Sequence, residues 1–221
     1  MKPIKQLWLI LTHGKRVADT LQNHTFSVDS PSGFELIEVS PDRVHAKFFE
    51  RLEIFEEVDT PFGDVQKIHI VRYVVIDFTV IKVSEGLSLI KILRPPVSIK
   101  SFSKKLMEAF AYEGALKKAS FNLAEVYSLI QGDSAIDRLV VTKVTASQVP
   151  VGDRATARVE VASITNALLE LQKEYNSPVV KLEKIMISAR MNFELEILDV
   201  SAAGSIYCTP GMEFYLEKTL F

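Results

Sequence analysis

Hydrophobic and polar residues alternate along much of this chain, and the longest apolar stretch lies near its middle. In residues 68–83 the clearly polar side chains are His69, Arg72, Asp77, Thr79 and Lys82. A Ser-Glu-Gly turn and a second apolar stretch, residues 87–93, follow directly. This pattern predicts two buried strands joined by a tight turn.

Four other segments have the residue spacing of helices. Residues 98–112 place Ile99, Phe102, Leu106 and Phe110 on one face, with Ser98 as the expected N-cap. Asn122 and Glu125 resemble a capping box, and Gly132 is the expected end of that helix. Residues 164–175 repeat the apolar helical spacing, and a short helix is expected over residues 15–23.

The rest of the chain predicts strands and turns. Residues 44–58 alternate well enough for a long strand with one buried and one mixed face. The C-terminal part predicts strands over residues 179–191, 193–200, 205–208 and 212–220. Two turns share the pattern Pro-x-Gly-Asp, at residues 61–64 and 150–153, which suggests an internal duplication; two unrelated hairpins would give the same pattern.

These elements together predict an α+β fold. We expect a large, mostly antiparallel sheet covered by three or four helices, because hairpins outnumber strand-helix-strand crossovers. Two related halves, residues 1–132 and 133–221, are the expected domains, with one continuous domain as the alternative. A length of 221 residues, 48% of them hydrophobic, is enough for a substantial core.

Composition narrows the class of protein. The net charge of −2 is not that of a strongly basic nucleic-acid-binding protein, so any such contact needs a local basic patch. Cys208 is the sole cysteine and cannot form an internal disulfide, which favours a reducing compartment. No stretch has the roughly 20 apolar residues of a membrane-spanning helix, so we expect a soluble, cytoplasmic protein.

One local basic patch does occur. Between Glu85 and Glu108 the chain contains no acidic residue. The basic residues of this window are Lys91, Arg94, Lys100, Lys104 and Lys105. Lys100 and Lys104 share one helix face near a helix N-terminus, which favours an anion or nucleic acid; a solvated helix face is the alternative interpretation.

Asp77 is unusual because it lies in the apolar segment Val-Val-Ile-Asp-Phe-Thr-Val. A buried, unpaired carboxylate costs several kcal/mol, so a partner such as Arg72 is expected unless the strand is an edge strand. The segment also resembles the first strand of RNase H-like nucleases. That resemblance implies two Mg²⁺ ions held by Asp77 with Glu108, Glu125 or Asp137.

Acidic and aromatic residues are mixed in the neighbouring segment. Phe49, Phe55 and Phe62 accompany acids that include Glu53, Glu56, Glu57 and Asp59. This composition suits a protein interface, although a solvated edge strand would look similar. We select Phe49, Phe55, Glu56 and Phe62 as the candidate interface residues.

The sequence favours a non-enzymatic binding or assembly subunit that docks to a partner protein. It contains no dinucleotide or phosphate-loop fingerprint and no metal-ligand spacing among its four histidines, and we expect no cofactor. A nucleic-acid-binding module is the first alternative, and a metal-dependent nuclease centred on Asp77 is the second. A homo-oligomer is compatible with each of these functions.

Overall fold

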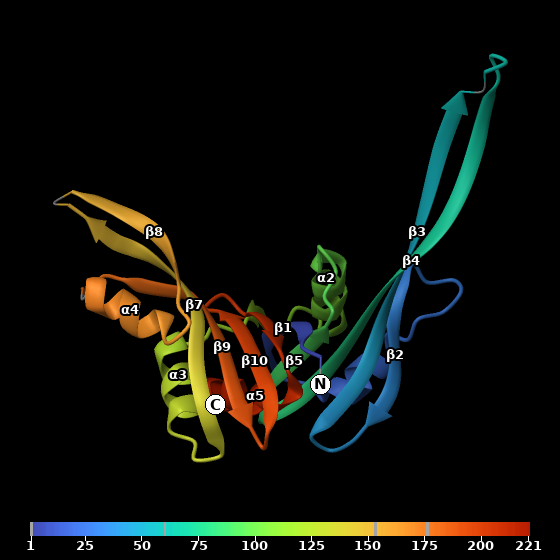
Figure 1. Cartoon of the computed structure of the whole chain (residues 1–221). Helices are drawn as coiled ribbons and strands as arrows, with labels where there is room; N and C mark the ends of the chain where they lie inside the picture. The colour runs from blue at the N-terminus through green and yellow to red at the C-terminus, as the bar shows by residue number, and fades with distance from the viewer. Residues whose placement is uncertain (1, 60, 153, 176) are drawn as a thin grey trace. The chain divides into compact units, whose positions relative to one another are not determined.

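The computed structural model describes residues 2–59, 61–152, 154–175 and 177–221 and is mainly β (Figure 1). Strands account for 53% and helices for 20% of the chain, with one open eleven-stranded, mostly antiparallel sheet and five short helices. The predicted α+β class, with three or four helices covering the sheet, is therefore wrong. The helices have only 6 to 11 residues, too short to cover a sheet of this size.

Two compact units make up the chain. One is Ile10–Lys117, and the other combines Met1–Leu9 with Lys118–Phe221. We name them the central unit and the terminal unit and describe each by itself. The division at residue 132, which the repeated turns suggested, stays a prediction.

The central unit contains the strand order β2-β3-β4-β5. Its elements are α1 (Val17–Gln22), β2 (Ser32–Val39), β3 (Arg43–Asp59), β4 (Val65–Ser84), β5 (Leu87–Leu93) and α2 (Lys100–Ala109). Strand β1 (Ile4–His13) contributes residues to both units, and β6 (Gly114–Lys118) pairs with β1.

The terminal unit contains the strand order β11-β10-β9-β7-β8. Its elements are α3 (Leu123–Gln131), β7 (Ile136–Val151), β8 (Ala155–Ala162), α4 (Ala167–Glu174), β9 (Lys181–Met191), β10 (Glu194–Ser201), β11 (Ser205–Cys208) and α5 (Pro210–Leu220). Neighbouring strands of this order pair antiparallel.

Aromatic packing builds the core of the central unit. Phe102 of α2 contacts Phe48 and Phe78 edge-on, with ring centroids 5.7 and 4.9 Å apart. Phe34 of β2 joins the cluster, and Leu106 is also fully buried. The predicted apolar stripe therefore packs α2 on one face of β2, β3 and β4. The predicted N-cap is wrong by one residue, because Ile99 occupies that position.

In the terminal unit the predicted cap of α3 is confirmed. The Asn122 side chain accepts a hydrogen bond from the Glu125 backbone N–H, and Gly132 ends the helix. The strand predicted over residues 212–220 is wrong, because that segment is the helix α5. Pro210 suits a first helical turn, and Met212, Tyr215 and Leu216 share the buried face at helical spacing.

The interpretation of residues 68–83 as a buried strand is half right. Ile76, Phe78 and Val80 of β4 are buried, but most residues of its first half are exposed. Thr60, which directly precedes the first predicted turn, and Asp153, the last residue of the second, lie outside the described residues. In the described part of the chain, no helix has the length and apolar character needed to cross a membrane.

Candidate functional site

A two-stranded arm projects from the sheet of the central unit (Figure 1). Strand β2 pairs with β3 only as far as Glu50, and β5 pairs with β4 only from Asp77 onward. The pairing of β3 with β4 continues without a register shift to Asp59 opposite Val65. We call residues 52–59 and 65–72 the arm; eight paired residues give it a length of about 27 Å.

One face of the arm is apolar. Because direct partners in an antiparallel pair point to the same side, this face is set by the register that begins with Leu52 opposite Arg72. The aliphatic residues on it are Leu52, Ile54, Val58, Ile68 and Ile70. This aliphatic face continues the core face of the sheet, where Phe48 lies opposite Ile76, but α2 packs only on the inner part.

The opposite face of the arm is tied together by its own side chains. Phe55 stacks on His69 with ring centroids 4.5 Å apart and planes nearly parallel. Lys67 pairs with Glu57 at 3.2 Å, and the His69 ring lies 3.4 Å from Glu53. These cross-strand contacts satisfy polar groups of this stacked face locally. Phe55, Val65 and Val71 on the same face are exposed.

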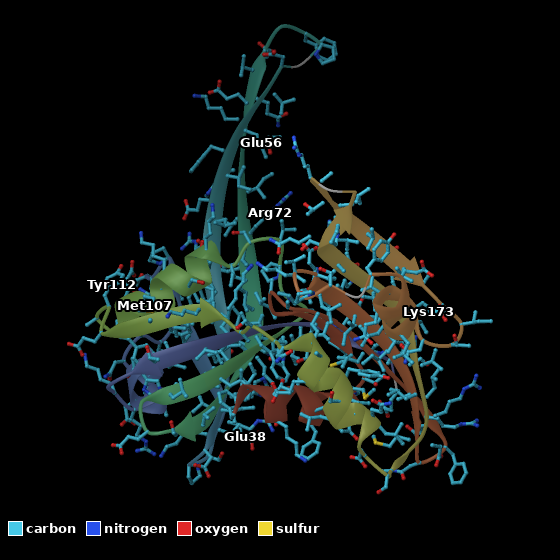
Figure 2. All side chains as sticks on the ribbon, turned by 90° about the vertical axis from the view of Figure 1, so that its left-hand side faces the viewer. Glu38, Glu56, Arg72, Met107, Tyr112 and Lys173 are labelled. Atoms are coloured by element: carbon cyan, nitrogen blue, oxygen red, sulfur yellow. The ribbon has the colours of Figure 1, made fainter. Side chains whose placement is uncertain are left out.

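The predicted interface residues fall on different parts of the arm and its base. Phe49 stacks on Phe26 at the base of the arm, whereas Phe62 is at the tip and 91% exposed. Phe55, 74% exposed, lies on the stacked face, and Glu56 lies on the aliphatic face opposite Ile68. Figure 2 labels Glu56 and Arg72 along the arm. The structure therefore does not bring these four residues together on one surface.

Sequence reasoning missed the aliphatic residues as interface candidates. Their alternation predicted burial, and Ile54 and Ile70 look like core residues in the sequence. The missing signal is the length of the neighbouring strands: β3 has 17 residues and β2 only 8, so β3 extends beyond the sheet.

Asp77 lies where β4 enters the four-stranded part of the sheet, since β5 begins to pair with β4 at this residue. Its carboxylate is 2.9 Å from Nε2 of His45 on β3, and Lys47 is its direct cross-strand neighbour. The side chain is 39% exposed, so it is not a buried orphan. Among the described residues, no group of three or more His, Cys, Asp or Glu side chains has the arrangement of a metal site.

The basic residues of the window lie in different environments. Lys91 is only 8% exposed on β5, while Arg94 follows that strand and is exposed. On α2, Lys104 and Lys105 both approach the carboxylate of Glu108, at 3.8 and 3.9 Å. Lys100 is exposed at the start of the helix. The helix thus carries its own counter-charge beside the lysines.

The chain was also compared with known proteins. No family model matches it, and no curated protein is similar to it.

Proposed function

We propose that this protein is a binding or assembly subunit that docks to a partner protein through the aliphatic face of the β3–β4 arm. The observation that carries the proposal is the row of aliphatic residues on this unflanked hairpin. Leu52, Val58 and Ile68 on it are each at least 36% exposed. Neighbouring exposed apolar residues are typical of interaction sites.

The energetics of a free hairpin support the same function. A two-stranded hairpin without a third strand or a helix is only marginally stable in water. Covering the aliphatic face would remove five aliphatic side chains from water, at about 1 kcal/mol or more for each one that becomes fully buried. A partner that covers this face would therefore stabilise the arm, and burial of the aliphatic side chains would contribute to the affinity of the complex.

The chemistry of the aliphatic face indicates what the partner presents. Glu56 and Arg72 lie among the aliphatic residues, so the face contains one acidic and one basic side chain. A complementary surface has an apolar centre with a cation near Glu56 and an anion near Arg72. Pairing of the exposed strand edges would add backbone hydrogen bonds.

Site-specific photocrosslinking tests the proposal. A photoreactive amino acid placed at Ile70 faces the partner, whereas the same residue placed at His69, one position away, faces the opposite side. We expect a crosslinked adduct at position 70 that is absent or much weaker at position 69. The adduct is then identified by mass spectrometry, which distinguishes another protein from a second copy of this chain.

A second variant tests whether the aliphatic side chains are needed for the contact with the partner. For this variant the photoreactive amino acid is placed at Ile68, which lies on the same face. Ile54→Lys combined with Ile70→Lys places two charges on the aliphatic face, and we expect the adduct at position 68 to disappear. Equal adducts on both faces, or none in the cells that produce the protein, would contradict docking through this face. An adduct with the chain itself would show that the arm joins two copies.

A further inference from the structure

A cavity of about 460 Å³ lies on one face of the sheet in the terminal unit, over the β9–β10 hairpin and the adjacent strand β7. Figure 1 shows these three strands side by side. The other face of the same strands is the core face, where the direct neighbours Val141, Ile187 and Leu198 are fully buried. The cavity therefore opens on the outer face of this sheet, and its volume is within the range of small-molecule sites.

Two arginines lie opposite each other in the lining of this cavity. Arg138 of β7 and Arg190 of β9 are direct partners in the antiparallel pair, so both side chains project from the same face. Like charges directly opposite each other in a sheet are destabilising. This repulsion is retained in the fold, which calls for a counter-charge at this position.

The part of the chain that the structure describes does not supply that counter-charge. Neither guanidinium group forms an ion pair or donates a hydrogen bond to a described residue, and both side chains are exposed. No acidic residue is among the described residues that line the cavity. Asp137, the acid nearest to Arg138 in sequence, lies at a register shift of β7 and forms no ion pair with either arginine. The lining thus has two uncompensated positive charges.

The β9–β10 turn adds an exposed aromatic side chain to the same lining. The turn consists of Asn192 and Phe193, whose φ angles are 50° and 66°. Asn-Gly is the favoured pair in such a turn, because a bulky residue adopts a positive φ only at an energetic cost. Phe193 is 89% exposed and Leu195 63% exposed, so packing within the described structure does not compensate for this cost. Backbone strain of this kind is typical of functional sites.

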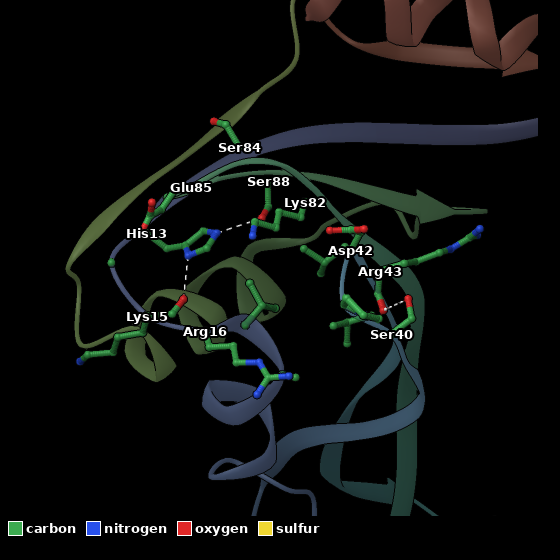
Figure 3. Close-up of a pocket in the computed structure, with 17 residues that line it drawn as sticks. His13, Lys15, Arg16, Ser40, Asp42, Arg43, Lys82, Ser84, Glu85 and Ser88 are labelled. Carbon is green, nitrogen blue, oxygen red and sulfur yellow. Dashed lines mark hydrogen bonds between the residues drawn. The ribbon is translucent and has the colours of Figure 1, made fainter.

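The charge of this cavity distinguishes it from one of similar size in the central unit (Figure 3). Lys15 in that second cavity pairs with Glu113 at 3.1 Å. Arg16 pairs with Asp19 at 3.8 Å. The other charged lining residues, two basic and two acidic, balance, so that cavity has no net charge that favours an anion. It lies where the β1–α1, β2–β3 and β4–β5 connections meet, and its lining includes His13, Asp42 and Lys82.

From these observations we infer that the cavity of the terminal unit binds a small phosphate monoester whose organic group is apolar. A phosphate monoester carries about two negative charges at neutral pH, which match the two arginines. The guanidinium groups of Arg138 and Arg190 donate to the phosphate oxygens, since their planar forks suit this geometry. The apolar group contacts Phe193 and Leu195. This inference is independent of the arm, whose residues do not line the cavity.

Titration with phenyl phosphate, inorganic phosphate and phenylacetate, followed by the backbone amide signals in NMR spectra, tests the inference. We expect phenyl phosphate to shift the signals of residues around the cavity saturably. Inorganic phosphate lacks the apolar group and phenylacetate has a single negative charge, so both should bind more weakly than phenyl phosphate.

Substitutions separate the contacts with the phosphate from those with the apolar group. Arg138→Gln and Arg190→Gln should each weaken phenyl phosphate by roughly tenfold, because each removes one charge-assisted contact. Phe193→Gly should weaken phenyl phosphate and leave inorganic phosphate unchanged. Arg154→Gln, beyond the other end of β7 and outside the cavity lining, is the matched control and should change neither.

Thermal unfolding without ligand gives a second readout. Phe193→Gly should raise the melting temperature, because glycine adopts a positive φ without strain. The two arginine variants should be at least as stable as wild type, because the repulsion between the two charges is gone. A lower melting temperature for Phe193→Gly would show that this side chain supports the fold and not a ligand.

Three binding results would overturn the inference. Absence of saturable shifts with phenyl phosphate, or equal affinity of wild type and both arginine variants, would exclude the anion site. Inorganic phosphate that binds as tightly as phenyl phosphate would exclude the apolar contact. Phenylacetate that binds as tightly as phenyl phosphate would exclude the phosphate as the group that the arginines recognise.

Discussion

Asp133 and Tyr215 lie 82 positions apart in the chain and form a hydrogen bond within the terminal unit. The Tyr215 hydroxyl donates to Oδ2 of Asp133 at 2.8 Å, and the Ala135 backbone N–H donates to Oδ1 at 2.8 Å. The Ala135 contact, followed by the Tyr215 contact, lowers the pKa of Asp133. Burial, followed by the hydrogen bond to Asp133, raises the pKa of Tyr215 to about 12.

Tyr215→Phe removes this hydrogen bond and keeps the ring. We expect the free energy of unfolding at pH 7 to fall by about 1 kcal/mol, the usual net contribution of one intramolecular hydrogen bond. Since the folded pKa of Tyr215 lies above the unfolded value near 10, its contribution is complete below pH 10. It is lost as the pH rises through about 12.

Urea unfolding of both proteins from pH 7 to 12 measures this effect. The difference between wild type and Tyr215→Phe should be constant up to about pH 10 and shrink above it. At the acid end, the lowered pKa of Asp133 contributes stability above the unfolded value of 3.8. That stability is lost as the pH falls through the folded pKa. A difference that is independent of pH would contradict the structural assignment.

At the scale of elements, the β3–β4 hairpin has an inner and an outer part with different supports. The inner part packs through Phe48 and Phe78 against Phe102 of α2. The outer part, the arm, has contacts between its own two strands. We therefore expect packing of the inner part to stabilise the fold, while the arm contributes little to the free energy of unfolding and is available for an interface.

Replacing residues 53–71 with Asn-Gly shortens the hairpin to a two-residue turn between Leu52 and Arg72. We expect the central unit to remain folded, with stability changed by less than about 1 kcal/mol. Phe102→Ala, the comparison variant, should cost about 3–5 kcal/mol because it opens a cavity in the aromatic cluster. Thermal unfolding followed by circular dichroism measures both. Unfolding of the shortened protein would show that the arm supports the core.

At the scale of the whole molecule, the net charge and its distribution do not favour binding of a long polyanion such as a nucleic acid. The net charge is −2, and on α2 Glu108 lies beside Lys104 and Lys105. We therefore expect no tight binding to an extended nucleic acid.

Fluorescence anisotropy with labelled DNA and RNA checks this expectation. We expect weak binding, with a dissociation constant above about 100 μM at physiological salt, as for non-specific contacts. The double variant Lys100→Glu and Lys104→Glu should behave like wild type. Tight binding that weakens steeply with salt and disappears in this variant would support the nucleic-acid alternative instead. Loss of signal that requires Mg²⁺ would favour the nuclease alternative.

Local pattern was enough to predict several elements. The N-cap at Asn122, the apolar stripe of α2 and the strand at residues 205–208 depend on neighbours in sequence, and the structure confirms them. The prediction of a strand at residues 212–220 is wrong because the apolar residues of this segment fit the period of a strand as well as that of a helix. Pro210, which suits the first turn of a helix, is the signal that distinguishes the two. The sequence predicted the segment that contains the candidate interface but not its two faces, because the pairing of β3 with β4 decides which residues share a face.

The sequence by itself determined which residues are apolar, where turns and caps occur, and that no strong overall charge directs the molecule to nucleic acid. Only the tertiary structure decided that the row from Leu52 to Ile70 is uncovered and that His13, Asp42 and Lys82 line one cavity. Burial and proximity depend on where neighbouring strands stop and which turns share an end of the sheet. Those relations join distant residues, and hydrophobic periodicity along the chain does not encode them.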